Sequence, residues 1–192
     1  MTSSDSHYVS HYSMPMNLVL VEDGDGDEKV VRGLSQKAQG ATTPFASYHV
    51  RPVNIVLVED DDGDAKAVRR AFQKAKIANP FIRAVDGLDA LDILRGANGK
   101  AKVAAPYLLL VDLNMPRMGG IQLIRALRAD EQLRQSIAFI LTTSSSDDDK
   151  EAAYDLHVAG YIVKATAGQD FLNLADLVDC YWRIVELPTH VG

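Results

Sequence analysis

Acidic, hydroxyl and ammonium side chains follow short apolar runs at several places in this sequence. Glu59 and Asp60 follow NIVLV, Asp112 follows YLLLV, Thr142 follows IAFIL and Lys164 follows GYIV. Carboxylates held close together repel one another unless a cation shares the site, and hard divalent ions such as Mg²⁺ take oxygen ligands. Together these residues could support metal-dependent attack by a carboxylate on phosphorus, with an ammonium and a hydroxyl offsetting charge on the phosphoryl oxygens.

Each of these residues also has an ordinary structural interpretation when taken alone. The acidic turn at 59–64 is typical of a helix start, and we expect Asp64 to cap the helix that follows. Asp112 before Asn-Met-Pro is compatible with an Asx turn, Thr142 with a plain strand residue and Lys164 with a surface charge. Because four strand ends carry complementary groups, the joint functional interpretation is favoured over coincidence.

Apolar runs and helical spacings alternate along the chain from residue 53 onward. Strands are expected where short runs are bounded by turn residues, at 53–58, 81–85, 107–111, 137–141 and 161–163. Helices are expected where apolar residues recur at helical spacing, at 64–77, 88–94, 121–127, 170–185 and a segment ending at 156. This alternation predicts an α/β fold with a doubly wound, five-stranded parallel sheet, in which ligands bind beyond the carboxyl ends of the strands.

An internal repeat precedes this region. Residues 17–39 match residues 54–76 at 15 of 23 positions, so the first strand and the start of its helix are duplicated. No phosphoacceptor strand follows the first copy, which we interpret as a relic. The predicted organisation is a flexible tail at 1–16, a partial repeat plus linker at 17–52, one domain at 53–188 and a tail at 189–192.

Composition excludes several classes of function. The formal net charge of -6 and the lack of a Lys/Arg cluster argue against nucleic-acid binding. No run approaches the roughly 18 apolar residues of a membrane span, so no membrane partner is expected. The beginning of the sequence has no apolar signal core, and a single cysteine excludes an internal disulfide framework, so we expect a cytoplasmic protein.

Four segments resemble the response-regulator receiver domain of two-component signalling, and they occur in the family's order: VEDD at 58–61, LLLVDLNMPRMGG at 108–120, ILTTS at 140–144 and GYIVKA at 160–165. Each motif is weak alone, but the combination is specific. The resemblance covers about 53–188 and implies the flavodoxin-like receiver fold.

The resemblance implies a role for each residue at the strand ends. Asp112 corresponds to the phosphoacceptor, Lys164 to the phosphate-sensing lysine, and Thr142 and Tyr161 to the switch pair. The Mg²⁺ ligands that it implies are Glu59, Asp60, Asp112 and the backbone carbonyl of Asn114. Ala165 stands where the family usually has proline, which puts a cis bond after Lys164 in doubt, because a non-proline cis peptide costs about 2.5 to 4 kcal/mol.

A narrower resemblance points to the kinase partner. The long loop at 96–106, DLHVAGYIVK at 155–164 and CYWRIVELP at 180–188 are similar to small receivers paired with phytochrome-type histidine kinases. We therefore expect a single-domain regulator that takes a phosphoryl group from such a sensor kinase onto Asp112. Its output would be contact with an unknown downstream protein or phosphorelay, and its only catalysis would be its own phosphorylation and dephosphorylation.

Two other functions remain open on the sequence. A haloacid-dehalogenase-like phosphohydrolase also uses an Asp nucleophile with Mg²⁺, but it needs a second Asp two residues later, where this chain has Asn114. A pseudo-receiver that only binds partners is the other alternative. The intact set of Glu59, Asp60, Asp112 and Lys164 argues against it.

The last predicted helix, 170–185, carries an apolar arc of roughly 180°, whereas a helix with one buried face needs about 100°. The surplus predicts a two-fold homodimer through this helix. The interface residues expected are Phe171, Leu174, Val178, Tyr181, Trp182 and Val185. The alternative is that the extra apolar width packs within the chain, on the sheet or under the N-terminal arm.

Overall fold

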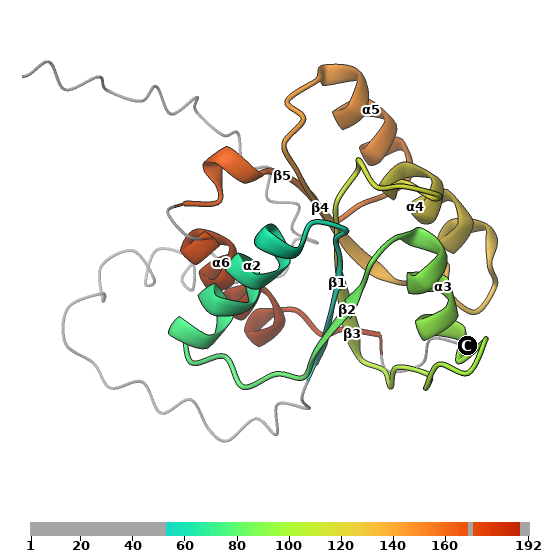
Figure 1. Ribbon diagram of the computed structural model, residues 1–192, viewed down its shortest axis with the longest axis horizontal. Helices are drawn as coiled ribbons and strands as arrows, with labels where there is room; N and C mark the ends of the chain where they lie inside the picture. Colours follow the sequence, from blue (N-terminus) through green and yellow to red (C-terminus); the bar gives the residue numbers. More distant parts are fainter. Residues whose placement is uncertain (1–52, 169–170, 189–192) are drawn as a thin grey trace, which may run out of the picture. The chain divides into compact units, whose positions relative to one another are not determined.

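The computed structural model describes residues 53–168 and 171–188 (Figure 1). The predicted tails and the partial repeat with its linker therefore lie outside the described residues. The strands are β1 (Asn54–Val58), β2 (Phe81–Ala84), β3 (Tyr107–Val111), β4 (Ile137–Thr142) and β5 (Gly160–Val163). The helices are α2 (Asp62–Lys74), α3 (Gly87–Arg95), α4 (Gly120–Ala129), α5 (Asp147–Asp155) and α6 (Leu172–Ile184), with a short 3₁₀ helix, η1 (Lys164–Thr166).

The five strands form one parallel sheet in the order β2-β1-β3-β4-β5, which confirms the predicted doubly wound sheet. β1 and β3 lie inside the sheet, and every residue of β3 is buried. Strands covered on both faces are expected to be continuously apolar, as IVLV at 55–58 and YLLLV at 107–111 are. The register pairs Val58 with both Ala84 and Val111, so the carboxyl ends of β1, β2 and β3 lie level at one edge.

Alternate strand residues supply two separate cores. Figure 1 shows α2 and α6 on one side of the sheet and α3, α4 and α5 on the other. Val56 and Leu109 face the core shared with α3, α4 and α5. Ile55 and Leu108 face the other core, shared with α2 and α6. Because side chains alternate between the faces of a strand, a single apolar run fills both layers. Among the described helices, none has the length and apolar character needed to cross a membrane.

The start of α2 corrects the prediction that Asp64 caps this helix. The helix begins at Asp62, and the side chain of Asp61 accepts the hydrogen bond from the Asp64 N–H at 2.8 Å. Asp61 has extended backbone dihedrals, as an N-cap residue requires. The acidic run offers several residues able to cap, and the tertiary fold selects Asp61. The carboxylate of Asp64 is left for another partner.

Most of the residues predicted to form a dimer interface pack instead against the core of the monomer. Leu174, Val178 and Trp182 are buried in the core between α6 and the sheet. Tyr181 packs edge to face against Phe139 with 5.1 Å between ring centroids, and Phe171 packs against the same core. Of the predicted set only Val185 is exposed; Leu172, Leu177 and Ile184 of α6 are exposed as well. Packing on the sheet thus accounts for much of the wide apolar arc, and dimerisation stays a prediction.

Candidate functional site

The carboxyl ends of four strands place polar side chains at one edge of the sheet, as the sequence predicts. Glu59 and Asp60 follow β1, Asp112 follows β3, Thr142 ends β4 and Lys164 follows β5. Four of the five side chains are shielded from solvent, and Asp60 is exposed. Ligands bind at this edge in doubly wound sheets, because the loops that follow the strands leave a crevice there.

Three carboxylates form a cluster that could hold a cation. Glu59, Asp60 and Asp112 each offer an oxygen within 4.8 Å of the others. An all-oxygen donor set fits a hard ion such as Mg²⁺. Burial raises the pKa of the Glu59 carboxyl above its usual value, although the hydrogen bond from Lys164 and its charge oppose this shift. The raised pKa of Glu59 indicates that the site disfavours negative charge on this carboxyl, and a bound cation would offset that effect.

The orientation of the Asp112 carboxylate is fixed from two sides. Its Oδ2 accepts a hydrogen bond of 2.8 Å from the backbone N–H of Asn114. Its Oδ1 faces the Lys164 ammonium at 3.3 Å. A Cβ atom at Gly120 would overlap the Asp112 carbonyl oxygen, so the Gly-Gly pair allows α4 to begin close behind Asp112.

Lys164 binds a carboxylate that the sequence did not assign to the site. Its Nζ lies 2.8 Å from Glu59 Oε2 and 2.7 Å from Asp64 Oδ2. Burial lowers the pKa of the Lys164 ammonium, but the hydrogen bonds to Asp64 and Glu59 outweigh this effect and raise the pKa well above its usual value. Lys164 is therefore a permanent cation. No local pattern marks Asp64 for the site, because Asp60 precedes the Asp61 cap and helical spacing does not relate it to Asp64.

The peptide bond after Lys164 is trans, because the only cis bond in the described part of the chain precedes Pro106. The sequence had left this bond open on account of Ala165. η1 begins at Lys164 itself, so the lysine leaves the sheet through a tight turn.

Thr142 and Tyr161 both bind the loop between β4 and α5. Thr142 is fully buried, and its Oγ1 accepts a hydrogen bond of 3.2 Å from the N–H of Ser144. The Tyr161 hydroxyl donates to the carbonyl of the same residue at 3.1 Å. The predicted switch pair is thus joined through Ser144, whose own hydroxyl donates to Asp149 at 2.6 Å.

Arg83 supports the acidic turn from β2, and sequence reasoning did not single it out. Its guanidinium donates to the carbonyl of Glu59 at 3.0 Å and to the carbonyl of Asp60 at 2.9 Å. It also pairs with the Asp62 carboxylate. The register that pairs Arg83 with Leu57 brings it beside this turn, and no local pattern reveals that register.

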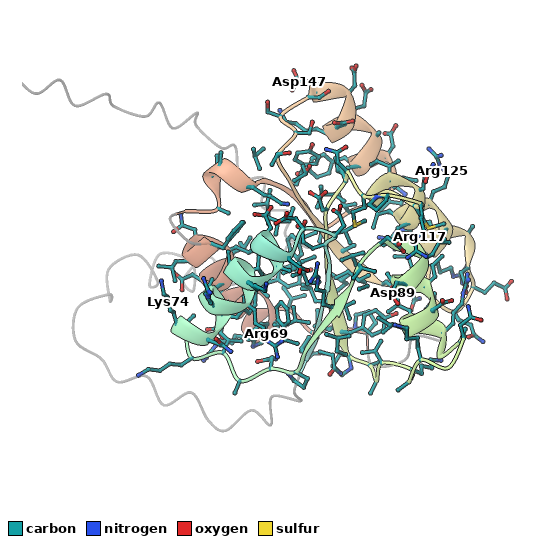
Figure 2. All side chains as sticks on the ribbon, in the orientation of Figure 1. Arg69, Lys74, Asp89, Arg117, Arg125 and Asp147 are labelled. Carbon is teal, nitrogen blue, oxygen red and sulfur yellow. The ribbon has the colours of Figure 1, made fainter. Side chains whose placement is uncertain are left out.

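A second ion pair ties the loop after Asp112 to α3. Asp86 is buried, caps α3 by accepting from the Asp89 N–H at 2.9 Å, and forms an ion pair with Arg117. Figure 2 shows Arg117 and Asp89 on the α3 side of the sheet, away from α2 and α6. The Gly87 N–H donates to the Met118 carbonyl at 3.0 Å. The loop that carries Asn114 is therefore anchored at its far end.

Comparisons with known proteins agree with this geometry. The model of the family described as "Response regulator receiver domain" matches residues 55–176. The response regulator Rcp1 from Synechocystis sp. is 31% identical over 104 residues, which cover 54% of this chain and 71% of Rcp1. The probable methanogenesis regulatory protein FilR2 from Methanothrix harundinacea is 35% identical over 97 residues, which cover 50% of this chain but only 62% of FilR2.

Solved structures give the same result. The phosphorylated cyanobacterial phytochrome response regulator RcpA superposes with a TM-score of 0.65 at 28% identity, covering 72% of this chain and 99% of RcpA. The Mn²⁺-bound form of Rcp1 superposes with a TM-score of 0.62 at 30% identity, covering 71% of this chain and 99% of Rcp1. A receiver domain is not a conventional enzyme, so the phosphohydrolase alternative loses its support. The chain belongs to the response regulator receiver domain family.

Proposed function

We propose that this protein is a response regulator that accepts a phosphoryl group from a sensor histidine kinase onto Asp112. The observation that carries the proposal is the fixed Asp112 carboxylate, with Oδ2 held by Asn114 and Oδ1 facing Lys164. A carboxylate oxygen of Asp112 would form the new bond to phosphorus while the bond from phosphorus to the kinase histidine breaks. The electron pair returns to the imidazole nitrogen, which then takes up a proton.

Glu59, Asp60 and Asp112 would hold Mg²⁺, and the family resemblance adds the backbone carbonyl of Asn114. When bound, the ion offsets negative charge on the transferring phosphoryl group. The Mn²⁺-bound form of Rcp1 supports a divalent ion in this family. From the protein side, the Lys164 ammonium supplies positive charge at the same edge of the sheet.

The kinase partner that we infer is of the phytochrome type. RcpA is described as a cyanobacterial phytochrome response regulator, and another similar structure, RPA3017, as a response regulator in red light signalling. The output proposed is contact with a downstream protein or onward phosphorelay. The alternative of a phosphorylation-independent pseudo-receiver is disfavoured because the three carboxylates lie close together and Lys164 forms ion pairs with Glu59 and Asp112.

The direct test is incubation with acetyl phosphate and Mg²⁺, followed by intact-mass measurement. The wild-type chain should gain one acid-labile phosphoryl group, and Asp112→Asn should gain none. In Asp60→Ala the yield of phosphorylation should no longer rise when Mg²⁺ is added, because a proposed ligand of the ion is missing. Phosphorylation of Asp112→Asn at full yield would overturn the assignment. Phosphotransfer from a phytochrome-type kinase, compared with an unrelated histidine kinase, then tests the partner.

A further inference from the structure

Asp64 holds Lys164 from outside the carboxylate cluster of Glu59, Asp60 and Asp112. The distance from Lys164 Nζ to Asp64 Oδ2, 2.7 Å, is shorter than the 3.3 Å to Asp112 Oδ1. The contact joins the first turn of α2 to the start of η1, 100 residues apart in sequence. Because Asp61 caps α2, the Asp64 carboxylate is not needed for the helix start.

The Lys164 ammonium makes two short hydrogen bonds and one longer ion pair. A lysine ammonium has three donors and no acceptor. Glu59 and Asp64 accept hydrogen bonds at 2.8 and 2.7 Å, and Asp112 Oδ1 forms an ion pair with the ammonium at 3.3 Å. Only 10% of the Lys164 side chain is exposed, whereas 37% of the Asp64 side chain is, so the ammonium depends mainly on carboxylates of the protein and the Asp64 contact lies at the edge of the site.

We propose that Asp64 is a positioning residue for phosphoryl transfer. It fixes the rotation of the Lys164 ammonium, so that one N–H is directed at the oxygens of the phosphoryl group on Asp112. Without Asp64, one hydrogen bond to Glu59 and the longer ion pair with Asp112 would remain to orient the ammonium. The inference rests on the proposed function and adds to it a residue with no place in the carboxylate cluster.

A double-mutant cycle separates positioning from a structural role. The initial rate of phosphorylation by acetyl phosphate is measured in wild type, Asp64→Ala, Lys164→Ala and the double variant. Asp64→Ala should lower the rate about three- to tenfold, in keeping with one partly exposed charge-assisted hydrogen bond. In the Lys164→Ala background the same substitution should lower the rate no further, because the ammonium that Asp64 positions is gone.

Asp148→Asn is the matched control for charge. Asp148 is exposed on the first turn of α5, at the same edge of the sheet as Asp64. Its replacement by Asn changes the net charge by the same amount as Asp64→Ala. We expect the wild-type rate in this variant. Asp64→Asn should recover part of the rate lost in Asp64→Ala, because the amide oxygen still accepts a hydrogen bond. Thermal unfolding of each variant confirms that it is folded.

A second measurement does not depend on phosphorylation or metal. With ¹⁵N-labelled lysine and no Mg²⁺, the Lys164 ammonium should give a slowly exchanging NMR signal in wild type and lose it in Asp64→Ala. An unchanged or faster rate in Asp64→Ala, an equal loss in both backgrounds, or an unaltered NMR signal would overturn the proposal. These outcomes concern Asp64 alone, whereas failure of the proposed function would show in wild type and in Asp112→Asn.

Discussion

The Tyr161 hydroxyl donates a 3.1 Å hydrogen bond to the carbonyl of Ser144, the residue whose N–H is bound by Thr142. The two residues of the predicted switch pair therefore act on one peptide segment from neighbouring strands. A movement of Ser144 would change the hydrogen bonds of both. Thr142 is buried and Tyr161 is half-buried, so loss of each hydroxyl should lower the free energy of unfolding by a different amount.

Thr142→Val should be more destabilising than Tyr161→Phe. The first change removes a fully buried acceptor and leaves the Ser144 N–H without it, at a cost of about 1 to 3 kcal/mol in unfolding free energy. The second frees a carbonyl that solvent can reach, at about 1 kcal/mol or less. Urea unfolding of the two variants measures the difference, and a larger loss for Tyr161→Phe would contradict this ranking.

Arg83→Ala should weaken divalent-ion binding about tenfold, as is typical when a residue that orients ligands is removed. Arg83 holds the carbonyls of Glu59 and Asp60, so its loss frees the turn that presents both carboxylates. Isothermal titration with Mn²⁺ measures the affinity. Arg125→Ala, on the exposed face of α4, controls for the lost positive charge and should bind Mn²⁺ like wild type. Equal effects of the two variants would rule out the positioning role.

Tyr107 should make stability sensitive to alkaline pH. Its hydroxyl forms a buried 2.8 Å hydrogen bond with Ser136, and burial raises its pKa above the usual value of about 10. Because the folded pKa is raised, this stabilisation is complete below about pH 10 and is lost as the pH rises through the folded pKa. Tyr107→Phe should cost about 1 kcal/mol at neutral pH. Urea unfolding near pH 11 should show a smaller difference in unfolding free energy between wild type and Tyr107→Phe. An unchanged difference would contradict the link between Tyr107 ionisation and stability.

Helix α6 allows dimerisation to be tested without damage to the core. Trp182→Ala should lower the unfolding free energy by about 3 kcal/mol whatever the oligomeric state, because Trp182 packs in the core. Leu177→Glu combined with Ile184→Glu changes only exposed apolar residues. Light scattering at micromolar concentration should give a dimer for wild type and a monomer for this double variant. A wild-type monomer, with and without phosphodonor, would end the dimer hypothesis.

Deletion of residues 1–50 should leave phosphorylation of Asp112 intact. β1 pairs with β2 and β3 in the sheet, and its sequence NIVLV is repeated as NLVLV at 17–21. The first copy could not replace α2 equally well. It has Glu28 and Ser35 at the positions where α2 buries Ala65 and Phe72. Intact-mass measurement after acetyl phosphate treatment tests the shortened chain. Failure of that chain to fold would show the arm to be integral.

The strands of this protein could be predicted from local sequence. β3 has the predicted bounds, 107–111, because a buried parallel strand must be apolar on both faces and ends where the first charged residue, Asp112, appears. Helix ends were less well predicted: α6 runs from Leu172 to Ile184 rather than over 170–185. Capping depends on backbone dihedrals, and a run of similar acidic residues does not specify which one adopts them.

The sequence by itself determined that carboxylates, a threonine and a lysine stand at strand ends, because the alternation of apolar runs and turns sets that spacing. Only the tertiary structure decided which of them touch. The contacts of Lys164 with Asp64 and of Arg83 with the carbonyls of the acidic turn depend on strand order and register. The burial of Trp182 depends on how α6 packs across the sheet. Such contacts join residues far apart in the chain, whereas periodicity and motif spacing describe only neighbours.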